Sequence, residues 1–352
     1  MSFSLSDPAG ALRGVRLWHE REISSPDLSY EFGRAPSAWT LRLPRPDVDR
    51  LEYQFELTEA NGRTRLVCDP ANPRRAPGPF GDKSVVEFPE YRPPAWLNGA
   101  GGPAWLNGAG GRTPRGRLIR TRLPSHTLRT DVEAWLWSSP GSRRSTKLPL
   151  LLVHDGPEYA QYSALVDMLD RLTASGALPP MRAALLAPAR RNREYSASAA
   201  YARALASDLL PAIRELAPPA RPPVGMGSSL GALAMLHVQR RYPGLLAAMF
   251  LQSGSFFHSS VGDARFDFTR GRRITRFVGG VLAAGTCDDP IPISMTCGAL
   301  EMNLANNRAM RDALALQGYD ASLHAGRDLH NWVAWRDLFD PHLVALLRRM
   351  WT

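Results

Sequence analysis

The chain has 352 residues, of which 44% are hydrophobic and 22% charged, so its composition is that of a globular protein and excludes a disordered one. This length predicts one large domain and a smaller one. The formal net charge of +10 could indicate nucleic-acid binding, but the arginines are scattered and no zinc-finger, RNA-recognition or basic-zipper pattern occurs. We therefore expect no nucleic-acid partner and favour an anionic small-molecule substrate.

The first ten residues, "MSFSLSDPAG", carry neither the basic segment nor the apolar segment of a signal peptide. No apolar run approaches the roughly eighteen residues of a membrane span. Cysteines occur only at positions 68, 287 and 297, an odd number without the CxxC spacing of a zinc site. We expect a cytoplasmic protein with no membrane contact, no disulfide framework, no metal and no cofactor.

Residues 30–90 contain short alternating runs such as "AWTLRLP" and "LEYQFELT", separated by Pro, Gly, Asn and Asp, which predict a small β-sandwich. A perfect nine-residue tandem duplication, "PAWLNGAGGPAWLNGAGG", follows it over residues 94–111. Two copies are too few for a solenoid, so the duplication predicts a flexible linker. The expected domains are a β-sandwich at 1–93, this linker at 94–111 and a catalytic domain at 112–352.

Beyond the linker, two strand-like segments precede a series of apolar runs that alternate with helical segments. The runs are "PLLLVH", "MRAALLAP", "PPVGMG", "AAMFLQSG", "IPISMTCG" and "ASLHAG". Unbroken apolar strands separated by helices predict a mostly parallel sheet covered on both faces.

The stretch "VGMGSSLGALAM" contains a G-x-S-x-G frame, which alone is a weak signal because glycine and serine are common in loops. Here a short strand precedes the frame and a helix-forming segment follows it, which is the context of a nucleophile elbow. Ser229 fits the frame and Ser228 does not. The alternative is a strand-to-helix turn without chemistry.

A serine hydroxyl needs a base to remove its proton, and in the Ser, acid, His order of this fold that base is a histidine later in the chain. His330 comes after the strand "ASLHAG", at the expected active edge of the sheet. The third member should be a carboxylate in a loop after an intervening strand. Glu301 follows "IPISMTC" and has that position, although it could instead be a first-turn acid of the next helix. Asp328 lies at the same edge, only two residues before the histidine.

An oxyanion hole needs two backbone N–H donors, and Leu230, the residue after the nucleophile, would supply one. The second should come from "VHDGPEY", in which Pro157 has no N–H group. Gly156 or Glu158 is therefore the candidate, and we take Gly156.

Together, "LLLVHDGPEYA", "GMGSSLGALAM" followed by "QSGSFF", "CGALEMNLANNRAM" and "HNWVAWRDLF" resemble the enterochelin esterase branch of the serine esterases. This resemblance covers most of residues 148–347 and implies an α/β-hydrolase fold. The stretch "DPANPRRAPGPFGDKSVVEFPEY" is similar to the immunoglobulin-like domain that precedes the hydrolase in that branch.

The resemblance implies hydrolysis of the trilactone of a ferric catecholate siderophore, with Ser229 as nucleophile, His330 as base and Glu301 as orienting acid. A basic cluster that follows the strand "MRAALLAP" suits such an anion and comprises Arg190, Arg191 and Arg193. Trp332, in the histidine motif, is a further expected substrate contact. The alternative for the cluster is a solvated basic loop.

Two other functions stay open at this point. Relatives with similar motifs cleave feruloyl or acetyl groups, or transfer acyl chains, because fold and triad are shared more widely than substrate. A non-catalytic carbohydrate-binding protein is the other alternative, in which Trp96 and Trp105 would stack on sugar rings.

Overall fold

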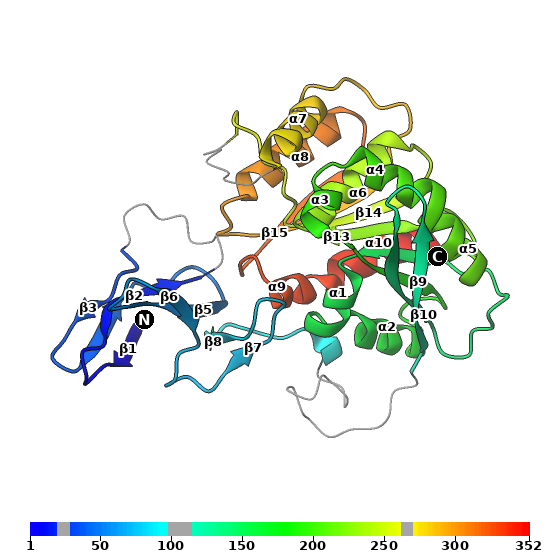
Figure 1. Ribbon diagram of the computed structural model, residues 1–352. Coiled ribbons are helices and arrows are strands. Elements are labelled where there is room, and N and C mark those ends of the chain that lie inside the picture. Colours follow the sequence, from blue (N-terminus) through cyan, green and yellow to red (C-terminus); the bar gives the residue numbers. More distant parts are fainter. Residues whose placement is uncertain (20–28, 98–114, 262–269) are drawn as a thin grey trace. The chain divides into compact units, whose positions relative to one another are not determined.

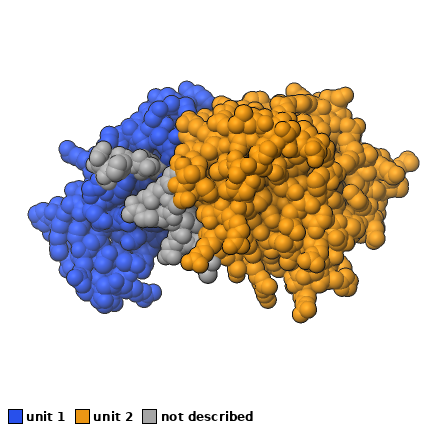
Figure 2. Space-filling model, turned by 90° about the horizontal axis from the view of Figure 1, so that it is seen from above, with its two compact units in different colours: residues 1–92, 298–302, 326–334 blue, residues 93–297, 303–325, 335–352 orange. Residues whose placement is uncertain are grey.

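The computed structural model describes residues 1–19, 29–97, 115–261 and 270–352. The chain divides into two compact units (Figure 2). Unit 1 comprises residues 1–92, 298–302 and 326–334, and unit 2 comprises residues 93–297, 303–325 and 335–352. Most of the linker expected at 94–111 lies outside the described residues.

Unit 1 contains two small antiparallel sheets (Figure 1). One has the order β1-β4-β3, and the other has the order β2-β5-β8-β7 with β6 paired to β5. The strands are β1 (Ser2–Ser6), β2 (Leu12–Trp18), β3 (Gly33–Arg34), β4 (Ala38–Arg42), β5 (Arg50–Glu59), β6 (Thr64–Val67), β7 (Arg75–Ala76) and β8 (Lys83–Glu87). The runs "AWTLRLP" and "LEYQFELT" are thus strands, as predicted.

Both sheets of unit 1 contribute to one apolar cluster. Phe3 and Trp39 come from the first sheet, and Phe55 and Leu57 from the second. Alternating burial along β1 and β4 explains this arrangement, because every second side chain points to the same face of a strand. The packing suits a sandwich, and an immunoglobulin-like topology stays a prediction.

Unit 2 is built on an eight-stranded sheet of order β16-β15-β14-β13-β11-β12-β10-β9, of which the last residues of β15 and β16 belong to unit 1. The pairs from β12 through β11, β13 and β14 to β15 are parallel, and β10 is antiparallel to both β9 and β12. The strands are β9 (Arg117–Ser125), β10 (Thr130–Ser138), β11 (Leu150–His154), β12 (Arg182–Ala187), β13 (Val224–Ser228), β14 (Ala248–Gln252), β15 (Ile293–Gly298) and β16 (Ala321–Gly326). The predicted mixed α/β fold with a mostly parallel sheet is confirmed.

Helices lie on both faces of this sheet, with α6 on one face and α1, α2 and α10 on the other (Figure 1). Every residue of β11, β13 and β14 is buried, as two-sided cover requires. Among the described residues, no helix is both long and apolar enough to span a membrane. The helices are η1 (Ala95–Leu97), α1 (Gly156–Tyr162), α2 (Leu165–Ala174), α3 (Arg191–Tyr195), α4 (Ala199–Ala204), η3 (Leu205–Leu209), α5 (Leu210–Leu216), α6 (Leu230–Arg241), α7 (Gly271–Leu282), α8 (Leu304–Leu316), α9 (Trp332–Asp337), η4 (Phe339–Leu343) and α10 (Val344–Trp351).

Candidate active site

Ser229 occupies a sharp turn between β13 and α6. Its φ of 53° and ψ of −120° are unusual for a residue with a side chain, and its backbone N–H donates to the Gln252 carbonyl at 2.9 Å. A Cβ atom on Gly227 would lie 2.6 Å from the Gly231 carbonyl carbon, so the strand and helix can approach this closely only with glycine there. Ser229 is half-buried whereas Ser228 is fully buried. The strand–turn–helix geometry is that of a nucleophile elbow.

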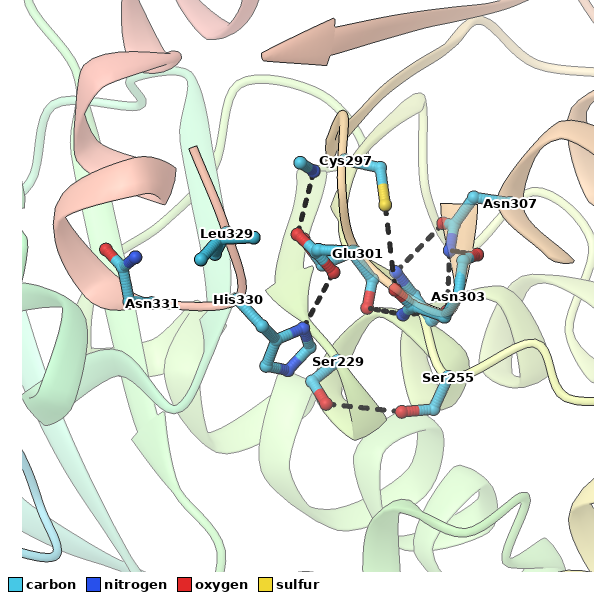
Figure 3. A network of polar contacts seen from close by, with 12 residues as sticks. Ser229, Ser255, Cys297, Glu301, Asn303, Asn307, Leu329, His330 and Asn331 are labelled. Carbon is cyan, nitrogen blue, oxygen red and sulfur yellow. Dashed lines mark hydrogen bonds and ion pairs between the residues drawn. The ribbon is translucent and has the colours of Figure 1, made fainter. Parts of the chain in front are cut away.

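Ser255 lies beside this elbow and was missed by the sequence reasoning. Its Oγ is 3.2 Å from the Ser229 Oγ, and its backbone N–H donates to the Ser229 carbonyl at 3.1 Å (Figure 3). The loop that carries Ser255 is held from α8, because Asn307 both donates to the Gly254 carbonyl and accepts from the Gly254 N–H, each at 2.9 Å. The only sequence signal that could have pointed to Ser255 was the motif "QSGSFF", which contains it.

The carboxylate of Glu301 is bonded to the ring of His330. Glu301 Oε2 lies 2.8 Å from His330 Nδ1, and Oε1 accepts the Gly298 N–H at 2.7 Å (Figure 3). The Glu301 side chain is 1% exposed and that of His330 19%. Because α8 begins at Leu304 with Asn303 as its N-cap, Glu301 precedes the helix, and the alternative of a first-turn acid is wrong.

Asp328, the other carboxylate at this edge, has different partners. Its Oδ1 accepts from the Leu329 N–H at 2.7 Å and from Asn331 Nδ2 at 3.0 Å. Burial raises the pKa of Asp328 to about 7, although the charge of Arg50 opposes that rise. Asp328 therefore fixes the turn that contains His330.

The two expected oxyanion donors begin helices. Leu230 is the first residue of α6 and Gly156 is the first of α1. A Cβ atom on Gly156 would lie 2.2 Å from the Leu185 Cβ, so glycine is needed there for packing against β12. The chemical role of both N–H groups stays a prediction, as does that of the alternative, Glu158.

The expected substrate-binding side chains have different surroundings. Arg191 forms a bidentate ion pair with the buried Asp155, with Nε to Oδ1 at 2.8 Å and Nη2 to Oδ2 at 2.7 Å. Arg190 precedes α3, Arg193 lies within it, and both side chains are exposed. Trp332 is half-buried at the first position of α9. The ion pair with Asp155 thus holds the Arg191 side chain in place, whereas the side chains of Arg190 and Arg193 are exposed.

His154, which also ends a strand near the elbow, has a structural role. Its side chain is fully buried, its Nδ1–H donates to the Gly231 carbonyl at 2.9 Å, and its ring stacks on Tyr195 with centroids 4.6 Å apart. Burial lowers its pKa to about 4. The imidazole is therefore neutral near pH 7 and packs the elbow helix against β11.

The model of the Esterase family matches residues 125–346, more than half of the chain. The chain belongs to this esterase family. A curated relative, the iron(III) enterobactin esterase of Dickeya dadantii (strain 3937), is 29% identical over 224 residues, which cover 60% of this chain and 51% of that protein. The chain thus spans about half the length of this curated relative. The resemblance to the enterochelin esterase branch is confirmed.

Solved structures show the same fold for this esterase-family chain. The ferric enterobactin esterase from Salmonella typhimurium superposes with a TM-score of 0.76 at 20% identity, covering 99% of this chain and 93% of that one. The enterochelin esterase from Shigella flexneri gives 0.75 at 19% identity, with 99% and 92% covered. A ferulic acid esterase gives 0.55 at 18% identity, covering 66% of this chain and 99% of that one.

Proposed function

We propose that the chain is a serine carboxylic-ester hydrolase in which Ser229 is the nucleophile, His330 the general base and Glu301 the orienting acid. The observation that carries the proposal is the bond between the Glu301 carboxylate and the His330 ring. Both oxygens of that carboxylate are bonded, one to His330 and the other to the Gly298 N–H. A carboxylate on Nδ1 leaves Nε2 unprotonated and ready to accept a proton. The strained elbow at Ser229 is the second support.

The order of these residues along the chain also supports the triad. Ser229 directly follows β13, Glu301 follows β15, and His330 follows β16, which is the Ser, acid, His order of α/β-hydrolases. The strands β13, β14 and β15 run parallel. Loops after the carboxyl ends of such strands form the active edge of an open α/β sheet.

The reaction then follows acyl-transfer chemistry. His330 Nε2 removes the Ser229 proton as Oγ attacks the ester carbonyl, and the N–H groups of Leu230 and Gly156 stabilise the oxyanion. Collapse of the tetrahedral intermediate breaks the bond to the leaving alcohol, which takes the proton from His330. Water, activated by the same histidine, hydrolyses the acyl-enzyme and regenerates Ser229.

The substrate that the observations favour is the trilactone of a ferric catecholate siderophore. One relative is named an iron(III) enterobactin esterase, and the Shigella flexneri enterobactin esterase was crystallised in the presence of enterobactin. A ferric triscatecholate is strongly anionic, and the exposed side chains of Arg190 and Arg193 would attract it. Iron would arrive with this substrate and take no part in the chemistry.

A feruloyl ester is the second candidate, because a ferulic acid esterase shares the fold with a TM-score of 0.55. The carbohydrate-binding alternative has less support, since the Trp96 side chain is only 8% exposed and Trp105 lies outside the described residues. A side chain that is buried cannot stack on a sugar ring.

A substrate panel tests the proposal. Hydrolysis of p-nitrophenyl butyrate, a feruloyl ester, and the iron-free and iron-loaded trilactones is measured for the wild type and for Ser229→Ala. We expect the highest kcat/KM on a trilactone and loss of turnover on the order of a millionfold in the variant. Ser228→Ala is the matched control and should retain turnover. Wild-type rates in Ser229→Ala would refute the serine mechanism, and a higher kcat/KM on the feruloyl ester would refute the siderophore substrate.

A further inference from the structure

Unit 1 joins the N-terminal sheets to the two segments that carry Glu301 and His330. The turn from Arg327 to Asn331, which we call the histidine turn, is anchored to these sheets in three ways. The first is apolar, because Leu329 is 3% exposed and clusters with Val48 and Leu51, both fully buried. The residue directly before His330 is therefore part of the core of unit 1.

The second anchor is at the start of the histidine turn. The Asp49 N–H donates to the Arg327 carbonyl at 2.8 Å. The Arg327 guanidinium in turn pairs with Asp47 through Nη1 at 2.8 Å and with Asp49 through Nε at 2.9 Å. These ion pairs are partly exposed, so each contributes little to stability by itself. The backbone bond fixes the path of the chain.

The third anchor is a buried polar network around Arg50. Arg50 is 3% exposed, and its Nη1 lies 2.6 Å from Glu52 Oε1 and 3.5 Å from Asn331 Oδ1. Asn331 also accepts the Ala334 N–H at 2.8 Å and donates to Asp328. Asn331 thus connects Arg50 to Asp328, whose carboxylate accepts the Leu329 N–H, and the Arg50 charge acts to lower the pKa of that carboxylate.

The network contains charges of both signs. Lys83 Nζ lies 3.6 Å from Glu52 Oε2, so the buried cations Arg50 and Lys83 both pair with the buried Glu52, and Asn331 connects Arg50 to the half-buried Asp328. Burying a charge is strongly unfavourable unless it is compensated and hydrogen-bonded. Removing Arg50 alone would take a compensating charge away from Asp328, raise the pKa of its carboxyl further and so change the group that holds the turn next to His330.

The acid segment is connected to the same turn. The Ala299 N–H donates to the Gly326 carbonyl at 2.7 Å, and a Cβ atom on Gly298 would lie only 2.3 Å from the Asp328 carbonyl oxygen. Gly298 also donates its N–H to Glu301. A shift of the histidine turn would therefore disturb both partners of the Glu301–His330 bond.

We propose that Arg50, in the N-terminal domain, is a positioning residue for the acid–histidine pair: it compensates Asp328 and so fixes the turn that aligns His330 with Glu301. The inference rests on the proposed function for its effect on turnover. It assigns the N-terminal domain a part in catalysis without any contact with substrate. Displacement of a reacting group by about 1 Å can reduce turnover about a hundredfold.

A double-mutant cycle tests this inference. Arg50→Met should lower kcat about a hundredfold with little change in KM, because the side chain acts through His330 alone. Asp328→Asn keeps the acceptor for Leu329 and removes the charge that Arg50 compensates, so the double variant should recover most of the lost kcat. Arg74→Met, which removes the exposed ion pair with Glu87, is the control and should leave kcat unchanged.

NMR titration of the His330 ring separates this inference from the proposed function, since it needs no turnover. Arg50→Met should shift the His330 pKa and the acidic limb of the pH–kcat profile together, and the double variant should restore both. Independent, additive losses in the cycle, or an unchanged His330 titration in a folded Arg50→Met, would overturn the inference. If Arg50→Met does not fold, Arg50→Gln, which also removes the charge, replaces it in the cycle. Wild-type turnover in Ser229→Ala would refute the proposed function and leave the titration test intact.

Discussion

Glu301 Oε2 and His330 Nδ1 are 2.8 Å apart, and the other oxygen of the same carboxylate is occupied by the Gly298 N–H at 2.7 Å. The carboxylate therefore cannot rotate without breaking a second bond. Because each oxygen has its own partner, the orientation of an amide placed at this position can be predicted.

In Glu301→Gln, the amide oxygen would stay on the Gly298 N–H and the NH₂ group would face His330 Nδ1. An NH₂ group donates, so the ring would have to accept at Nδ1 and carry its proton on Nε2, the wrong tautomer for a base. We expect kcat to fall by about 10⁴-fold, as in comparable triads. Steady-state kinetics on p-nitrophenyl butyrate measures this, and Asp288→Asn serves as control. Comparable rates for the two variants would exclude Glu301 as the orienting acid.

Two arginines of the basic cluster should have different roles: Arg191 should stabilise the fold, and Arg193 should contribute to substrate recognition. Arg191→Gln leaves the buried Asp155 without its bidentate partner, so unfolding free energy should fall by about 2 kcal/mol. Arg193→Gln should leave stability unchanged but raise KM for the iron-loaded trilactone. Attraction between exposed charges is screened over about 10 Å at 0.1 M salt, so the variant should also flatten the salt dependence of KM.

Chemical denaturation and kinetics at several salt concentrations check both variants, with the neutral p-nitrophenyl ester as control substrate. A rise of KM for both substrates in Arg193→Gln would indicate that Arg193 supports the loop and does not recognise the anion.

His154 should make the fold less stable in acid. Burial lowers its folded pKa to about 4, whereas an unfolded histidine titrates near 6.5. Between these values the unfolded state binds the extra proton, so stability falls as pH drops from about 6.5 to about 4, by up to about 1.4 kcal/mol per pH unit. His154→Asn keeps an N–H donor for the Gly231 carbonyl and removes the titration. Urea denaturation between pH 7 and 4.5 should show a shallower decline in the variant, and parallel curves would contradict this.

The strands of the large sheet and the elbow could be predicted from the sequence because their signals are local. Unbroken apolar runs mark buried strands, and the glycines around Ser229 mark a turn that permits close packing. The position of Glu301 could be predicted because it lies in the loop that follows a recognisable strand. These inferences need only the pattern within one segment.

The contacts around the site could not be predicted in this way. Arg50 and Asn331 are 281 positions apart, and no periodicity connects them. Arg191 was expected only as a member of a basic cluster, whereas it forms an ion pair with the buried carboxylate of Asp155, 36 positions earlier in the chain. The position of Ser255 depends on a loop that is held by Asn307 of α8 and by the N-cap residue of that helix, Asn303. Long-range polar contacts of this kind are decided by tertiary packing.

The most direct test of the central claim is covalent trapping of the nucleophile. The protein is incubated with an organophosphonate ester, which phosphonylates activated serines, and the modified peptide is identified by mass spectrometry. The account predicts one stoichiometric adduct on Ser229, with inactivation in parallel, and slow labelling of the same serine in His330→Ala. Labelling of Ser228 or Ser255, or full loss of activity without an adduct on Ser229, would contradict it.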